Sequence, residues 1–210
     1  MKPLFSAFAF VAAIVLAGPT AHAVPITFVA DLSGANENPP TPSAGTGTAF
    51  VTIDPALHSM EVQITFSGLT APTSASHIHC CEATPGANAN VMVATTVPSF
   101  PGFPLGVTSG TYDHVFNLLD AGTYNPAFIT SVFDLTQDVP GAEAALINGI
   151  EHDETYLNIH TSLLSPTGVQ LGFPTGEIRG LLVAVPEPSS VILLGAALLG
   201  FGVIRRRKRL

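Results

Sequence analysis

Glycine and proline are spread densely along residues 24–185, and their spacing limits what this segment can fold into. The segment contains 15 glycines and 14 prolines, which interrupt long helices and favour short strands joined by turns. Apolar and polar residues alternate most strictly over 59–66, the pattern of a strand with one buried face. The predicted strands are 26–32, 48–53, 59–66, 76–79, 91–96, 110–117, 155–161 and 177–184. Eight short strands predict an all-β fold, either a β-sandwich or a barrel.

Two segments depart from the strand pattern. Residues 138–150 favour one short inserted helix, with Asp138 as its N-cap. Residues 98–106 form a proline-rich loop that carries Phe100 and Phe103. Our hypothesis for these two rings is contact with carbohydrate or with another protein.

The first 23 residues have the three parts of a secretory signal peptide. Lys2 supplies the positive charge, residues 4–17 are apolar, and small residues precede a cleavage point after Ala23. The alternative is a membrane anchor, but the apolar run is shorter than the ~20 residues that a membrane-spanning helix needs. We therefore expect a signal helix that is removed on export.

The C-terminal segment, residues 186–210, has three parts in a fixed order. Pro186, Glu187 and Pro188 come first, an uncharged stretch over 191–204 follows, and a basic tail ends the chain. This order resembles the PEP-CTERM sorting signal of Gram-negative bacteria. The resemblance implies a C-terminal transmembrane helix, handling by the membrane enzyme exosortase, and release to the cell surface or the extracellular matrix. An ordinary tail anchor is the alternative.

Charge separates the middle of the chain from its ends. Residues 24–185 contain 14 acidic residues and a single basic one, Arg179. One cation cannot neutralise a row of phosphates, so binding to nucleic acid is excluded. The sequence thus predicts three parts: a signal peptide (1–23), one β domain (24–185) and a sorting segment (186–210).

Four short motifs occur in order along the β domain. They are LSGANENPP at 32–40, SHIH at 76–79, YLNIHT at 156–161 and GEIRG at 176–180. In this order and at these separations they resemble the CHRD domain, a module found in many exported bacterial proteins. The resemblance implies an immunoglobulin-like β-sandwich of about eight antiparallel strands. It implies no defined biochemical activity.

Three histidines fall in these motifs with the spacing of strand residues. His77 and His79 lie two apart and therefore share one face of a strand, with Ile78 on the other. His160 lies on a second strand, on the face opposite Ile159. If the two strands are neighbours, the three imidazoles converge and suit zinc or copper. The alternative is a set of imidazoles hydrogen-bonded to carbonyls, to Asn158 and to carboxylates of this acidic domain, without a metal.

The two cysteines of the chain are adjacent, at Cys80 and Cys81. An exported protein usually pairs its cysteines, but neighbours can join only in a small strained ring. A vicinal disulfide, two free thiols, a bridge to another chain, and thiolate ligands that extend the histidine cluster all remain open.

Arg179 is the lone basic residue of the β domain, and Glu177 lies two residues before it. We expect Arg179 to be a structural ion-pair partner of Glu177, of Glu37 or of another carboxylate.

Taken together, these features predict an exported structural or adhesive protein of the cell surface or biofilm matrix. Its predicted partners are exosortase, the secretion machinery, and extracellular polysaccharide or surface proteins. We do not expect an enzyme. The alternative function is that of an exported copper- or zinc-binding protein, or an enzyme of superoxide-dismutase type, which would use His77, His79 and His160.

Overall fold

The computed structural model describes residues 24–131, 133 and 136–186, and within them strands make up most of the regular secondary structure. The all-β class predicted from the sequence is confirmed. The eight strands are β1 (Ile26–Ser33), β2 (Thr46–Asp54), β3 (Ser59–Ser67), β4 (Thr73–His79), β5 (Gly110–Asn117), β6 (Tyr156–Thr161), β7 (Ile178–Leu181) and β8 (Val183–Ala184).

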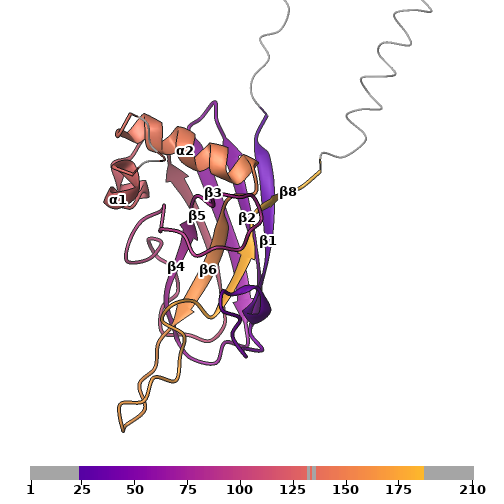
Figure 1. The fold of residues 1–210 in the computed structure, drawn as a ribbon, viewed down its shortest axis with the longest axis vertical. Helices are drawn as coiled ribbons and strands as arrows, with labels where there is room; N and C mark the ends of the chain where they lie inside the picture. The colour runs from indigo at the N-terminus through magenta and orange to yellow at the C-terminus, as the bar shows by residue number, and fades with distance from the viewer. Residues whose placement is uncertain (1–23, 132, 134–135, 187–210) are drawn as a thin grey trace, which may run out of the picture.

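All eight strands belong to one antiparallel sheet in the order β4-β6-β7-β1-β2-β3-β5, with β8 paired to β1. The sheet curls into a half-barrel (Figure 1). The strands thus form one continuous sheet, whereas the predicted β-sandwich would have two separate sheets. Main-chain bonds from Leu69 to Thr108 and between Thr73 and Val107 tie the chain entering β4 to the chain entering β5. The two ends of the sheet are thereby drawn together around the core.

Helices are few and short. The 3-10 turns η1 (Gly34–Asn36) and η2 (Ala121–Thr123) and the helix α1 (Pro126–Ile129) lie in connections. The longest helix, α2 (Val139–Glu151), is the one predicted over 138–150, and the Asp138 side chain caps it by accepting from the Gly141 amide. In Figure 1 α2 lies across one end of the curled sheet.

The core fills the concave side of the sheet, where alternate residues of each strand point inward. Fully buried side chains from strands and from α2 form one cluster that includes Phe28, Val51, Val62, Ile78, Leu146, Leu157 and Ile159. Ile78 and Ile159 therefore face the core, as the alternation predicts. The other face of β4 and β6 carries the histidines.

Two predictions about the segment after β4 are wrong. Residues 91–96 do not form a strand; they make only isolated bridges, such as that between Val93 and His79. Phe100 and Phe103 are not surface residues, since they are 2% and 5% exposed. Phe100 stacks on Tyr112 with ring centroids 5.7 Å apart, so the aromatic loop packs into the core. The hypothesis of carbohydrate contact at these two rings is thereby withdrawn.

No helix among the described residues is long and apolar enough to cross a membrane. The predicted signal helix (1–23) and transmembrane helix (191–204) lie outside the described residues, as do Glu187 and Pro188.

Candidate metal centre

The three histidines predicted to converge lie together on the outer face of β4 and β6. The two strands are direct neighbours, with His77 opposite Asn158 and His79 opposite Tyr156. His160 lies two residues beyond Asn158 and therefore diagonally across from His77. Side chains opposite and diagonal to one another on one face of a sheet are within contact distance.

Each imidazole has one nitrogen bound to a main-chain carbonyl from a different part of the chain. Nε2 of His77 donates to Pro98 O at 2.7 Å, and Nδ1 of His79 donates to Val91 O at 2.7 Å. Nδ1 of His160 donates to Pro174 O at 2.8 Å. A carbonyl oxygen only accepts hydrogen bonds, so these nitrogens carry the ring protons. Such bonds fix the tautomer and the orientation of metal-binding histidines.

The remaining nitrogens, His77 Nδ1, His79 Nε2 and His160 Nε2, are the candidate ligand atoms. The three rings offer ligand atoms that all lie within 4.8 Å of one another, and Nδ1 of His77 is 3.3 Å from Nε2 of His160. Two nitrogens bound to one tetrahedral zinc ion lie about 3.4 Å apart, given Zn–N bonds of about 2.0–2.1 Å. Nε2 of His79 is buried and has no hydrogen-bond partner. The donor set therefore fits a zinc or copper ion in type, and the pair formed by His77 and His160 also has the spacing of two ligands of one ion.

The cluster is largely withdrawn from solvent, with His77 and His79 only 6% and 8% exposed and His160 partly exposed. Burial, which disfavours the charged ring, lowers the pKa of His77, and it lowers the pKa of His79 and of His160 to about 4. The rings are therefore neutral near pH 7, the form that binds metals. His77 Nδ1 and His160 Nε2, which both carry a lone pair when the rings are neutral, then lie 3.3 Å apart. A cation between these two nitrogens would make the contact favourable.

Cys80 and Cys81 form a vicinal disulfide, one of the four possibilities that the sequence left open. Both sulfurs are buried, and α2 lies against them at Gly149. Among the described residues, the group of candidate ligands contains the three histidines and neither cysteine. Bonded to each other, the sulfurs offer no thiolate to extend the histidine cluster.

Arg179 is 1% exposed and pairs with Glu37, with Nε 3.4 Å from Oε2. Of the partners that the sequence left open for Arg179, the structure thus has Glu37. The Glu177 carboxylate accepts instead from the Thr161 and Ser43 hydroxyls and the Thr70 amide. Burial raises the pKa of Glu37 to about 7, although Arg179 acts in the opposite direction. Arg179 also donates to the main chain of Asn36, Asn88 and Ala89 and to the Asn90 side chain.

Two further residues of the YLNIHT motif lie beside the cluster, on the face where the strand alternation places them. Tyr156 stacks on His79 with ring centroids 4.6 Å apart, and the Arg179 guanidinium lies 4.4 Å from the centre of the tyrosine ring. Asn158 is 1% exposed beside His77. Both belong to the YLNIHT motif and share the face of His160, so the same alternation that grouped the histidines placed them there.

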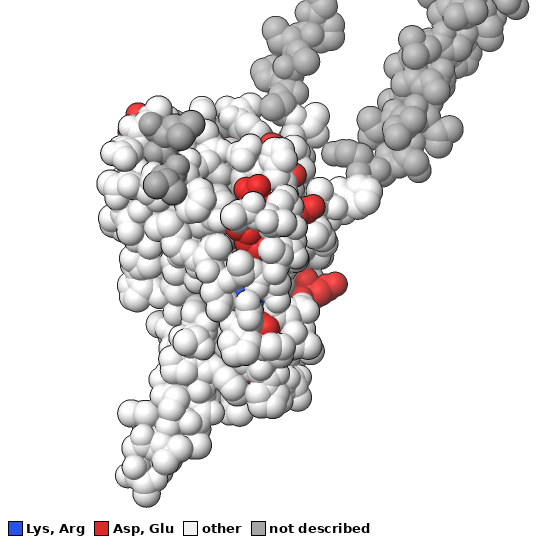
Figure 2. Space-filling view, viewed as in Figure 1, with Lys and Arg blue, Asp and Glu red and all other residues white. Residues whose placement is uncertain are grey.

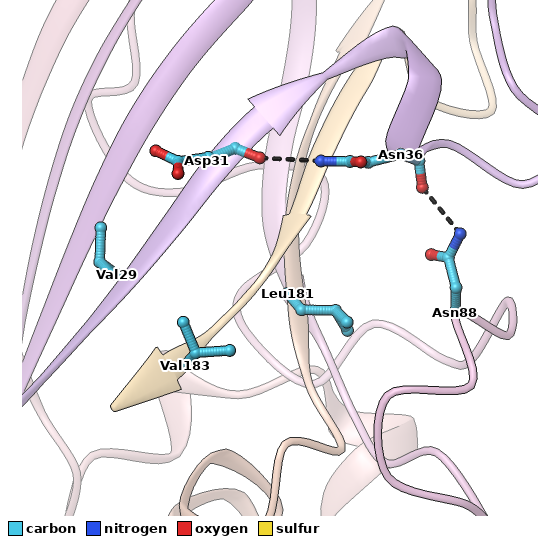
Figure 3. Close-up of a pocket in the computed structure, with 6 residues that line it drawn as sticks. All are labelled: Val29, Asp31, Asn36, Asn88, Leu181 and Val183. Carbon is cyan, nitrogen blue, oxygen red and sulfur yellow. Dashed lines mark hydrogen bonds between the residues drawn. The ribbon is translucent and has the colours of Figure 1, made fainter. Parts of the chain in front are cut away.

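A separate hollow opens on the outer face, along β1 and the neighbouring strands β7 and β8. Its volume is about 340 Å³, and Figure 3 shows its apolar floor, formed by Val29, Leu181 and Val183. Asn36 and Asn88 close one side of it and are hydrogen-bonded to each other. In the space-filling view of Figure 2, acidic side chains gather near the middle, and most of the remaining visible surface is uncharged. None of the three histidines lines this hollow.

A single curled β-sheet with a largely buried three-histidine cluster on its outer face defines a small all-β module. Residues 28–182 match the CHRD domain, and the chain belongs to the CHRD domain family. Residues 184–208 match the PEP-CTERM protein-sorting motif, which signals exosortase-dependent export with transient anchoring in the membrane. No curated protein matches the sequence.

Proposed function

We propose that this exported CHRD protein binds a zinc or copper ion through His77, His79 and His160. The observation that carries the proposal is that each ring has one nitrogen fixed by a main-chain carbonyl while the other faces its neighbours. Zinc would be held by nitrogen ligands at about 2.0–2.1 Å, and copper(II) also favours imidazole.

Binding rather than catalysis is the function that we propose for this centre. Among the described residues, the group of candidate ligands consists of three histidines, a set that can hold a metal ion whether or not a reaction follows. An enzyme of superoxide-dismutase type would need a reaction assay of its own.

A structural or adhesive role at the cell surface or in a biofilm matrix stays a prediction. The sorting motif supports export, whereas the aromatic loop that was expected to contact polysaccharide is buried. A metal-binding module and a surface component are compatible roles for one exported protein.

The experiment is metal analysis of the exported protein, purified in mild detergent with its C-terminal segment and then loaded with zinc or copper and dialysed. We expect about one ion per chain. His77→Ala and His160→Ala should each lose most of it, because a two-histidine site leaves one ligand position to solvent. His152→Ala is the matched control, since His152 is exposed and outside the cluster.

Thermal unfolding of each variant separates loss of ligand from loss of fold. A wild-type protein that retains no metal would refute the proposal. So would retention of equal metal by folded His77→Ala and His160→Ala.

A further inference from the structure

The side chain of Asn158 has an unusual position beside the histidine cluster. It is 1% exposed, and its Oδ1 is buried without a hydrogen-bond partner. A buried polar atom left unpaired is costly, so native structures seldom leave one without a partner such as a bound water or ion. The register places Asn158 directly opposite His77 on β4 and two residues from His160 on β6. The side chains of all three residues therefore share the outer face of the sheet.

The surrounding protein groups do not supply the missing donor. The N–H groups of His77, His79 and His160 already donate to the carbonyls of other segments. Arg179, which lies opposite Asn158 on β7, directs its bonds to residues 36 and 88–90. The donor for Asn158 Oδ1 therefore comes from outside the protein, as a water or a group that enters the site.

Three imidazoles leave the fourth position of a tetrahedral metal ion open, and water is the usual occupant of that position. A metal-bound water is a strong donor, and an amide oxygen is an acceptor with no proton to give. We propose, on the basis of the proposed metal function, that Asn158 Oδ1 accepts a hydrogen bond from a water or hydroxide bound at this fourth position. Asn158 is thus a specificity-determining residue that favours proton-carrying ligands over anions that only accept.

This role makes a measurable difference to ligand exchange. Azide is an acceptor-only anion that displaces water from cobalt(II) or copper(II). When azide binds, Asn158 Oδ1 loses its donor. Leucine, which is close to asparagine in shape but apolar, has no such oxygen to leave unpaired. Asn158→Leu should therefore bind azide about 3- to 10-fold more tightly than wild type, the ratio that one lost hydrogen bond of ordinary strength gives.

The test is an azide titration of the cobalt(II)-loaded exported protein, followed by its visible absorption. Asn148→Leu is the matched control, because Asn148 is exposed on α2 and should leave azide affinity unchanged. Asn158→Asp keeps an acceptor and adds negative charge, so it should bind azide more weakly than wild type. This second variant serves if Asn158→Leu does not fold.

The outcomes distinguish this inference from the proposed function. If wild type binds no cobalt, zinc or copper, the metal function itself is refuted. If wild type binds metal and azide affinity is the same in wild type and folded Asn158→Leu, including no binding in either, the role of Asn158 is overturned. Asn158→Asp with unchanged azide affinity overturns it equally.

Discussion

Replacing Gly149 with alanine sets two known effects against each other in α2. Alanine is the better helix former, which would stabilise the folded state by at most about 1 kcal/mol. A Cβ at this position would, however, lie 2.5 Å from Cys80 Sγ and 2.8 Å from Cys81 Sγ. Both sulfurs are buried and bonded to each other, so neither can move aside alone. Overpacking of this kind costs about 1–3 kcal/mol, and we expect a net loss of up to about 2 kcal/mol after the helix preference is subtracted.

The sign of this effect should reverse when the sulfurs are removed. In a background with Cys80→Ala and Cys81→Ala, the conflict with the sulfurs is gone, only Thr155 Cγ2 at 3.3 Å stays close to the added Cβ, and the helix preference of alanine remains. Gly149→Ala should then stabilise the protein by up to about 1 kcal/mol relative to that background. Equilibrium urea unfolding of the four proteins, followed by circular dichroism, measures both differences.

Ala144→Gly is the control, because Ala144 is exposed on the same helix. It should cost about 1 kcal/mol in both backgrounds. If Gly149→Ala raises the unfolding midpoint while the cysteines are present, or shifts it equally in both backgrounds, the close packing of α2 against the sulfurs is refuted.

Phe100→Ala should destabilise the protein by about 3–5 kcal/mol, because it empties a buried site against Tyr112; a melting temperature close to that of wild type would contradict this placement. The folded-state pKa of Glu37 is raised to about 7 by burial despite Arg179, so its contribution to stability is present below about pH 4.5 and lost as the pH rises toward 7. Glu37→Gln should remove that decline in the free energy of unfolding, measured by urea at several pH values. For Glu177, burial raises the pKa, but the hydrogen bonds from its hydroxyl and amide donors outweigh it, and the pKa is lowered. Its contribution is therefore present above about pH 4.5 and lost in acid, and Glu177→Gln should flatten the acid side of the same profile.

Strands with one buried and one exposed face were predictable, because apolar and polar residues alternate along them. In β3, Met60, Val62, Ile64 and Phe66 are all buried, and the predicted 59–66 differs by one residue from the observed strand. The segment 91–96 has similar apolar residues, but it is paired with β4 only at an isolated bridge between Val93 and His79. Local composition does not distinguish a strand within a sheet from a segment that lies along its edge.

The prediction that the aromatic loop contacts other molecules was wrong for a related reason. Proline, glycine and serine around Phe100 and Phe103 are typical of an exposed loop. The loop nevertheless packs against the buried face of β3 and β5, where Phe103 stacks on Phe66 with ring centroids 5.6 Å apart and Phe100 stacks on Tyr112. Burial of a large ring outweighed the local turn preference, and that choice depends on a tertiary shape that the local sequence does not encode.

The candidate site was predictable in its side chains but not in its supports. The two-residue spacing placed His77 and His79 on one face, and the YLNIHT motif placed His160. Convergence of the three histidines was predicted only on the condition that β4 and β6 are neighbours, because the alternation of residues along a strand does not indicate the order of strands in a sheet. The choice of Glu37 over Glu177 as the partner of Arg179 likewise depended on how the 36–38 turn lies beside β7.

The carbonyls that hold the three imidazoles belong to Val91, Pro98 and Pro174, and a main-chain oxygen remains in place whichever side chain its residue carries. Substitution in these loops can therefore proceed freely over evolution so long as the path of the backbone is kept. Insertions and deletions are different, because a change of one residue in length would move the oxygen away from its ring. Across relatives, loop length rather than loop identity should vary together with the presence of the three histidines.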